Sequence, residues 1–409
     1  MRASAAAVAL VVVALAAACG GSGSGSNSKA TITIVVDAPF SRSPYIGNTV
    51  ANGVRLAADQ LNARGISAGG KAYRIRVVRL DNALSPGRAV ADTRDALRRH
   101  AVAIVTDGTG VDATWRLANQ QHVPICISYQ GGSGLIDPKT RPNVFRIAPT
   151  DHGLAFRLAE YMVPKGLKIA LLTDDSDYGQ AGRASLDDAF KTVSKSVVAG
   201  ITLPSSASDL APQVLQARRS GATALLVWAL PPVLAKTVVA ARSAGWRVPV
   251  YATPAAEDPV LRQQLADHPT WLDGFTFASG RMTAELGASP WSAFEAAYES
   301  AFGATYVGVK SHGRRVISPP DYAMYSYDCM NLVAAAVQRA SGMDAKKVLA
   351  ALNQVSTRGA NGDERGFNEI NHEGVVDDDV YFARFEDMVF RPAKDDPLSS
   401  TLPVINQAR

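Results

Sequence analysis

Side chains that could perform catalysis or hold a metal occur in this sequence, but without the spacing that such chemistry needs. Asp174, Asp175 and Asp177 imitate the start of a calcium loop, yet no acidic residue closes the loop at the required position. The glycine-rich segment 131–134 lacks the lysine and the spacing of a nucleotide-binding loop. No CxxC pair, histidine cluster or GxSxG elbow occurs. The sequence therefore predicts a binding protein with no metal and no cofactor, rather than an enzyme such as an amidase.

Polar and aromatic residues gather instead where predicted buried strands end. Ligands of open α/β sheets bind outside the carboxyl ends of the strands, so these residues are candidates for a binding site. The segments concerned are 107–110, 128–130, 174–179, 228–232 and 252–253. If two sheets face each other with these ends, the segments line a cleft between two lobes. The simpler alternative for the hydroxyl-bearing candidates is that they are ordinary loop residues without a ligand. For Trp228 the simpler alternative is a place in the hydrophobic core.

The order of the predicted elements places these segments on two successive α/β blocks. Short apolar runs alternate with helical patterns, which indicates parallel sheets covered by helices. The predicted strands are 31–36, 73–80, 101–105, 123–127, 168–173, 197–201, 222–228 and 248–251. The first block ends near residues 143–151. The later part is predicted to be mostly helical, at 291–302, 323–341 and 345–354, before a hairpin at 381–385 and 388–390.

Composition is that of a folded protein with more than one domain. The chain has 409 residues, of which 47% are hydrophobic and 19% are charged, so it can bury a large core. The formal net charge of +5 is spread without a long basic run. Nucleic-acid binding is therefore not indicated, because it needs a clustered basic surface.

The first residues predict export and a lipid anchor. Arg2 is followed by a short run of small apolar residues that ends before Cys19, as in a secretory signal peptide. The cysteine in this position resembles the lipobox of bacterial lipoproteins, whose cysteine becomes the acylated N-terminus. We therefore predict a signal peptide over 1–18 and a lipidated, flexible tether over 19–30. The alternative is a plain signal peptide, with Cys19 incidental.

Two cysteines and six histidines remain to be placed. Cys126 lies in a predicted buried strand and Cys329 in a helical pattern, and an exported protein can form disulfides. A bridge between them and two buried free thiols are equally compatible with the sequence. The histidines are scattered beside charged or turn residues, so surface positions are expected for all six.

The whole pattern from residue 31 to 390 resembles the type I periplasmic binding protein family typified by the leucine/isoleucine/valine-binding protein. The order and spacing of several weak motifs carry the resemblance. They are Asn52-Gly53 to Asn62 with Gly65, Leu80-Asp81 with Pro86, Val123-Pro124 to Ser128, Phe145-Arg146 to Asp151, Asp174 to Gly179, Tyr325 to Asp328, and Asn371 to Gly374.

The resemblance implies which residues meet the ligand. Thr109 matches a serine that holds a carboxylate, Gln130 matches a position whose carbonyl meets an ammonium group, and Tyr178 and Tyr322 match aromatic contacts. The remaining predicted contacts are Ser133 (Gly132 being an equally allowed alignment), Trp228 and Thr253. The family's acidic anchor falls near Pro254, with Glu257 and Asp258 a few residues later, which favours an amide or a small organic acid over an α-amino acid.

The resemblance also implies the architecture and the role. It implies two Rossmann-like, doubly wound α/β lobes joined by a hinge of several strands, with lobe 1 over 31–148 and 282–360, lobe 2 over 149–281 and 361–395, and a tail over 396–409. It further implies an extracytoplasmic, membrane-anchored monomer that binds a small molecule by hinge closure and delivers it to an ABC permease. A ligand-sensing receptor subunit on the same fold is the alternative.

Overall fold

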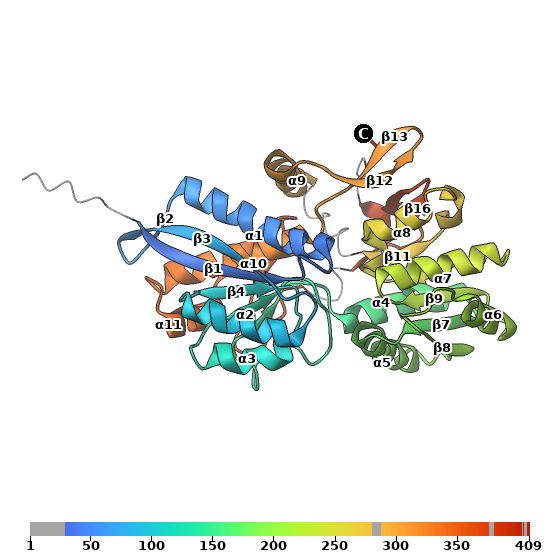
Figure 1. Ribbon diagram of the computed structural model, residues 1–409, viewed down its shortest axis with the longest axis horizontal. Helices are drawn as coiled ribbons and strands as arrows, with labels where there is room; N and C mark the ends of the chain where they lie inside the picture. The colour runs from blue at the N-terminus through green and yellow to red at the C-terminus, as the bar shows by residue number, and fades with distance from the viewer. Residues whose placement is uncertain (1–28, 280–287, 376–379, 403, 405–406) are drawn as a thin grey trace, which may run out of the picture.

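In the computed structural model, a six-stranded sheet forms the centre of lobe 1 (Figure 1). The described residues are 29–279, 288–375, 380–402, 404 and 407–409, so the predicted signal peptide and Cys19 lie outside them. The strand order is β2-β3-β1-β4-β5-β6, and all neighbours are parallel except β2 and β3. The strands are β1 (Ala30–Ala38), β2 (Ile66–Ala68), β3 (Lys71–Asp81), β4 (Ala103–Thr106), β5 (Ile125–Ile127) and β6 (Val144–Arg146).

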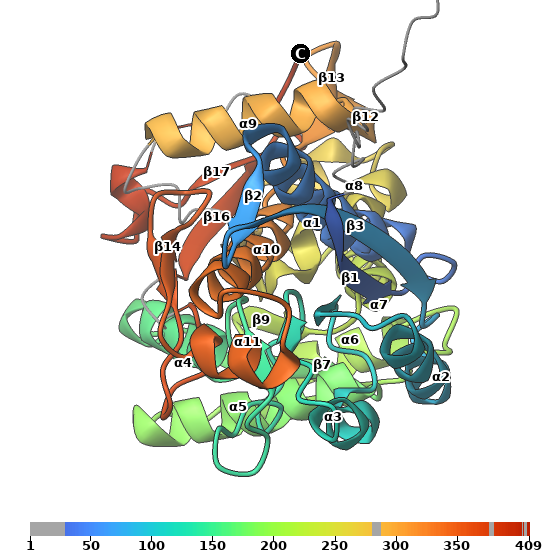
Figure 2. The same cartoon turned by 90° about the vertical axis from the view of Figure 1, so that its left-hand side faces the viewer.

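Helices cover both faces of this sheet, because successive side chains of a strand point to opposite sides. Ile34 and Val36 of β1 pack into the core beneath α1 and α10, whereas Val35 packs into the core beneath α2 and α3. Figure 2 shows the two pairs of helices on opposite sides of the sheet. The helices are α1 (Pro44–Arg64), α2 (Pro86–Arg98), α3 (Val111–Asn119) and α10 (Ala323–Arg339).

A seven-stranded sheet forms lobe 2 in the same manner. Its order is β17-β16-β11-β10-β9-β7-β8, with the five earlier strands parallel and the last two antiparallel. The strands are β7 (Ile169–Asp174), β8 (Ala199–Leu203), β9 (Ala224–Trp228), β10 (Val250–Ala252), β11 (Thr276–Ser279), β16 (Tyr381–Glu386) and β17 (Val389–Pro392). One face carries α4 (Asp151–Met162) and α5 (Asp177–Thr192), and the other α6 (Ala211–Arg219), α7 (Pro231–Ser243) and α8 (Pro259–Gln264).

The chain then returns to lobe 1 through helices, as predicted, but a strand pair interrupts them. α9 (Ala288–Phe302), α10 and α11 (Ala345–Leu352) pack into the core of lobe 1. Between α9 and α10, the hairpin of β12 (Thr305–Ser311) and β13 (Arg314–Ser318) packs its apolar side chains into the core of lobe 2. A smaller hairpin, β14 (Ser356–Arg358) and β15 (Glu364–Gly366), follows α11.

The β12–β13 hairpin was not predicted, although its signal is present in the sequence. Val307 and Val309 alternate with exposed residues, which is the period of a half-buried strand, and Gly313 turns the chain with a φ of 80°. The helical patterns on both sides of this short segment led to the prediction of a mostly helical region.

A disulfide joins Cys126 of β5 to Cys329 of α10, with the two Cα atoms 6.4 Å apart. The structure thereby decides between the two states that the sequence left open. Both cysteines are buried, Cys126 being 5% exposed and Cys329 0% exposed. The bond fastens a helix of the late part of the chain to the central sheet of lobe 1.

Candidate functional site

The strand-end loops of lobe 1 bring four polar residues together. Asp107 follows β4 and is 1% exposed, and its carboxyl group accepts a hydrogen bond of 2.6 Å from the Thr109 hydroxyl and one of 2.8 Å from the Asn82 amide. The Gln130 side-chain amide, from the loop after β5, lies 3.4 Å from the Thr109 oxygen. Burial raises the pKa of Asp107, while the bonds from Thr109 and Asn82 lower it.

The corresponding loops of lobe 2 join two further residues. The Tyr178 hydroxyl donates a hydrogen bond of 2.8 Å to the hydroxyl oxygen of Thr253, which follows β10. Ser176 is the N-cap of α5, the helix that carries Tyr178, because its hydroxyl oxygen accepts a hydrogen bond from the Gly179 backbone. The Asp174 carboxylate accepts hydrogen bonds from Ser176 and from the Leu230 backbone. In the segment whose aspartates resemble the start of a calcium loop, this carboxylate therefore stabilises a turn.

Four side chains from both lobes gather where the loops meet. Burial raises the pKa values of Tyr45, Tyr129 and Tyr322 well above the ordinary range of tyrosine, and the charge of Glu257 raises each further. The rings of Tyr129 and Tyr322 lie 4.8 Å apart. Glu257 ends a short 3-10 helix, η2 (Pro254–Glu257), in lobe 2 and accepts a bond from the Ser279 hydroxyl. The charge of Glu257 therefore acts on three tyrosine hydroxyl groups of lobe 1.

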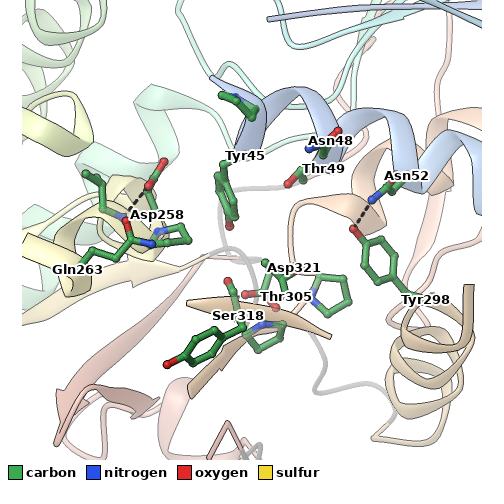
Figure 3. Close-up of a pocket in the computed structure, with 16 residues that line it drawn as sticks. Tyr45, Asn48, Thr49, Asn52, Asp258, Gln263, Tyr298, Thr305, Ser318 and Asp321 are labelled. Atoms are coloured by element: carbon green, nitrogen blue, oxygen red, sulfur yellow. Dashed lines mark hydrogen bonds between the residues drawn. The ribbon is translucent and has the colours of Figure 1, made fainter. Parts of the chain in front are cut away.

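A cavity of about 410 Å³ adjoins this cluster (Figure 3). One side is a single face of α1, from which Tyr45 projects into the space, and the opposite side is formed by α8 and the end of β13. Asp258 begins α8, with its carboxylate accepting a bond of 2.9 Å from the Val260 backbone, and burial raises its pKa. The other labelled lining residues are Asn48, Thr49, Asn52, Gln263, Tyr298, Thr305, Ser318 and Asp321. Elements of both lobes therefore bound one polar cavity.

Two connecting segments run side by side at the edge of lobe 1. The Arg146 backbone of β6 donates to the His372 carbonyl at 2.9 Å, and the Gly374 backbone donates to the Arg146 carbonyl at 2.7 Å. His372 is 1% exposed, stacks on Phe145, and lies 2.8 Å from the Val144 carbonyl through Nδ1. The expectation of a surface position was therefore wrong for this histidine, because its segment adds to the sheet edge.

Asp151 lies where the first connection enters lobe 2. It begins α4, is 3% exposed, and its backbone donates to the Gly131 carbonyl at 2.8 Å. Burial raises its pKa to about 6, although the charge of Arg146 opposes this, and its own charge raises the pKa of Tyr178. Asp151 thus lies between the loop of Gln130 and the Tyr178 side chain.

The structure places the predicted site residues in different surroundings, and none of them is among the residues that line the cavity. Thr109 with Gln130 and Tyr178 with Thr253 form the bonded pairs described above, and Tyr322 packs on Tyr129. Ser133 is exposed, and Trp228 is fully buried in the core of lobe 2, with the Tyr178 ring 5.8 Å away. Cys19 lies outside the described residues.

Tyr45 was not predicted as a member of the site, and Tyr129 and Asp107 were candidates only as parts of the strand-end segments. Tyr129 and Asp107 stand in the strand-end segments, so their position was the available signal. Tyr45 offered no such signal, because it lies in the first turn of a helix, and only the tertiary structure shows that it lines a cavity with Asp258 of lobe 2.

The described residues contain no group of three or more His, Cys, Asp or Glu side chains arranged to hold a metal ion. Within the same part of the chain, no helix is both long enough and apolar enough to cross a membrane.

Known proteins share this arrangement. A structure of a type 1 periplasmic binding protein from Bordetella pertussis Tohama I superposes with a TM-score of 0.77 at 21% identity, covering 89% of this chain and all (100%) of that one. The branched-chain amino acid transporter substrate binding protein LivJ from Streptococcus pneumoniae, in complex with isoleucine, superposes with a TM-score of 0.73 at 22% identity, covering 88% and 97%. These likenesses confirm the predicted fold of two α/β lobes.

Sequence comparison points to the same family. The Leu/Ile/Val-binding protein homolog 8 from Brucella abortus (strain 2308) is 26% identical over 194 residues, or 44% of this chain and 47% of that protein. The chain thus matches about half the length of this curated relative. The family model described as periplasmic binding protein matches residues 31–388. This match covers most of the chain, which therefore belongs to the periplasmic binding protein family and not to a family of enzymes.

Proposed function

We propose that this protein is the extracytoplasmic, lipid-anchored substrate-binding subunit of an ABC importer and closes its two lobes around a small polar ligand. The observation that carries the proposal is the cavity bounded by α1 of lobe 1 and α8 of lobe 2, beside Tyr129 and Tyr322. A ligand that touches both lobes stabilises the closed arrangement by its higher affinity for it.

The polar groups around the cleft fit such a ligand. Hydroxyl and amide groups line the cavity from both lobes, including Tyr45, Asn48 and Gln263. Binding sites use a few polar groups of this kind to fix the orientation of a small molecule. On this basis the ligand is amino acid-like, an amide or an organic acid. Its position between the Thr109–Gln130 and Tyr178–Thr253 pairs, which do not line this cavity, rests on the family resemblance.

The importer role rests on relatives. LivJ from Streptococcus pneumoniae is described as the substrate-binding protein of a branched-chain amino acid transporter. By analogy, the closed form of this chain would be recognised by a membrane permease. Export also agrees with the Cys126–Cys329 disulfide, since such bonds persist in oxidising compartments.

Ligand binding is tested by thermal unfolding of the purified full chain with amino acids, amides, urea and small carboxylates. A ligand present at 100 times its Kd adds about 2.7 kcal/mol of stability, which shifts the midpoint by several degrees. X-ray scattering with the binding compound should then show a smaller radius of gyration. If no compound shifts the midpoint, or if binding leaves the radius unchanged, the proposed function is wrong.

The anchor has its own test. Cys19→Ser should move the protein from the membrane fraction to the soluble extracellular fraction, because no thiol remains for acylation. Ser22→Ala, three residues along the same tether, is the matched control and should stay with the membrane. Equal release of the unaltered chain and the Cys19→Ser variant would contradict lipid anchoring.

A further inference from the structure

The hydrogen-bond pattern around Asp107 determines which way the Thr109 hydroxyl points. The Asp107 carboxyl group receives Thr109 on Oδ2 at 2.6 Å and Asn82 on Oδ1 at 2.8 Å. The Thr106 hydroxyl also approaches Oδ1, at 3.4 Å. Burial raises the pKa of Asp107, but donors on both of its oxygens favour the ionised carboxylate, because a carboxylate only accepts. The single hydrogen of the Thr109 hydroxyl is therefore directed at Asp107.

A hydroxyl whose hydrogen is engaged can only accept from a further partner. The Gln130 amide approaches the Thr109 oxygen at 3.4 Å, a distance that leaves a weak bond. The Thr109 oxygen, in a residue that is 8% exposed, can thus accept from one further donor. An N–H group of a ligand would be accepted there, whereas the oxygens of a carboxylate would face an oxygen with a buried negative charge behind it.

The surrounding charged groups supply no partner for a carboxylate. Asp37, at the end of β1, is 4% exposed, and burial together with the charges of Asp92 and Asp107 raises its pKa to about 9, so it is neutral at pH 7. The Arg146 guanidinium reaches the Gln130 carbonyl at 3.4 Å, but its other hydrogen bonds go to the Glu373 carboxylate and the Gly132 carbonyl. That guanidinium is therefore already engaged and is not a ready partner for a ligand carboxylate at Thr109.

We propose that Asp107, acting through Thr109, makes the lobe 1 contact select a hydrogen-bond donor of the ligand, so that an ammonium or amide N–H group, and not a carboxylate, is bound there. This inference rests on the proposed function, since it assumes that a ligand between the lobes meets Thr109. Asp107 is a positioning residue in this scheme, because it sets the direction of the Thr109 hydroxyl without touching the ligand.

The test compares amines with carboxylates of matched shape. Butylamine with butanoate, 2-methylbutylamine with 2-methylbutanoate, and benzylamine with benzoate are titrated calorimetrically into the full chain, and isoleucinamide is compared with isoleucine. We expect the amine or amide of the best-fitting pair to bind at least about tenfold more tightly than its partner, because a hydrogen bond to a charged group contributes more than one between neutral groups.

Variants then isolate the Asp107–Thr109 pair. Asp107→Asn should lower the ratio of amine to carboxylate affinity about tenfold, since the charge behind Thr109 is lost. Thr109→Val should lower the same ratio, whereas Thr109→Ser, which keeps the hydroxyl, should preserve it. Asp112→Asn is the control, because this carboxylate is 71% exposed on the neighbouring helix and pairs with Arg141. A purely structural role of Asp107 would change stability but not the ratio.

The outcomes separate this inference from the proposed function. Tighter binding of the carboxylates to the unaltered chain, or a ratio unchanged within twofold in both Asp107→Asn and Thr109→Val, overturns the inference while the binding itself supports the proposed function. Should Asp107→Asn fail to fold, Thr109→Val and the unaltered chain still decide. If neither these probes nor the wider compound set binds, the proposed function falls, and this inference with it.

Discussion

Arg146 and Glu373 stand 227 positions apart in the sequence, yet their side chains share two hydrogen bonds of 2.7 and 2.5 Å. The guanidinium is 3% exposed and the carboxylate 25%. Arg146 also donates to the Gly132 carbonyl at 2.9 Å, so the same side chain holds the loop that carries Gln130. The Arg146–Glu373 pair therefore joins the two connecting segments at the edge of lobe 1, and Arg146 links them to the loop that carries Gln130.

Removing this arginine should destabilise the protein and disturb the loop. Arg146→Ala is expected to lower the free energy of unfolding by about 2–4 kcal/mol, because a partly buried carboxylate and two loop carbonyls lose their donor. Glu373→Ala should cost less, since it leaves the contacts from Arg146 to the loop in place. Denaturant unfolding of both single variants and the double variant gives the coupling, expected at about 1–3 kcal/mol. Strictly additive effects would contradict a direct interaction.

The contact between α1 and α10 depends on a glycine. A Cβ atom at Gly53 would clash with the Ala323 carbonyl oxygen and the Ser326 hydroxyl. Gly53→Ala should therefore lower stability by about 1–3 kcal/mol, as overpacking of a core does. Gly87→Ala is the matched control. A Cβ atom at this position of α2 would lie 3.8 Å from its nearest neighbour, the Ser85 hydroxyl oxygen, so alanine fits without a clash. The midpoint of thermal unfolding should fall for Gly53→Ala and not for Gly87→Ala. Equal midpoints for the two variants would show that α1 and α10 move apart at little cost.

The Cys126–Cys329 bond should contribute measurably to stability. It links residues 203 positions apart, so its loss frees a long loop in the unfolded chain. Removing a native disulfide typically costs about 2–5 kcal/mol. We expect the Cys126→Ala, Cys329→Ala double variant to unfold at lower denaturant concentration than the oxidised protein. Reducing agent should shift the unaltered chain in the same direction and leave the double variant unchanged. A reductant effect on the double variant would point to another cause.

The buried carboxyl group of Asp37 should make the protein less stable at alkaline pH. Burial first, and then the charges of Asp92 and Asp107, raise its pKa from 3.8 to about 9. The folded state thus keeps a proton that the unfolded chain releases above pH 3.8. The stability linked to that proton is complete at low pH and is lost progressively as the pH rises to about 9.

Asp37→Asn tests this linkage. The variant has no proton to lose, so its unfolding midpoint should fall less between about pH 7 and pH 9 than that of the unaltered chain. This window excludes Asp151 and Asp328, whose pKa values of about 6 confine their effect to lower pH. Asp187→Asn, on the surface of α5, is the control for a simple change of net charge. Identical slopes for Asp37→Asn and the unaltered chain would contradict the assignment.

Much of the fold could be predicted from the sequence because its signals are local. The β-branched run of β1 and the apolar runs of β4 and β9 identify buried strands without knowledge of any partner. The polar residues after these strands, Thr109 and Tyr178 among them, could be proposed as a site for the same reason, since strand direction alone places them at one edge.

Other features depend on residues that are distant in the sequence. The bond between Cys126 and Cys329, the burial of His372 beside β6, and the cavity that Tyr45 and Asp258 line together each require a particular packing of separate elements. A pattern of apolar residues states which face of a helix is buried, but not which element covers it. The sequence by itself therefore determined two α/β lobes with polar strand ends. Only the tertiary structure decided that the Thr109 hydroxyl is directed at Asp107, because that choice depends on donors brought together from three loops.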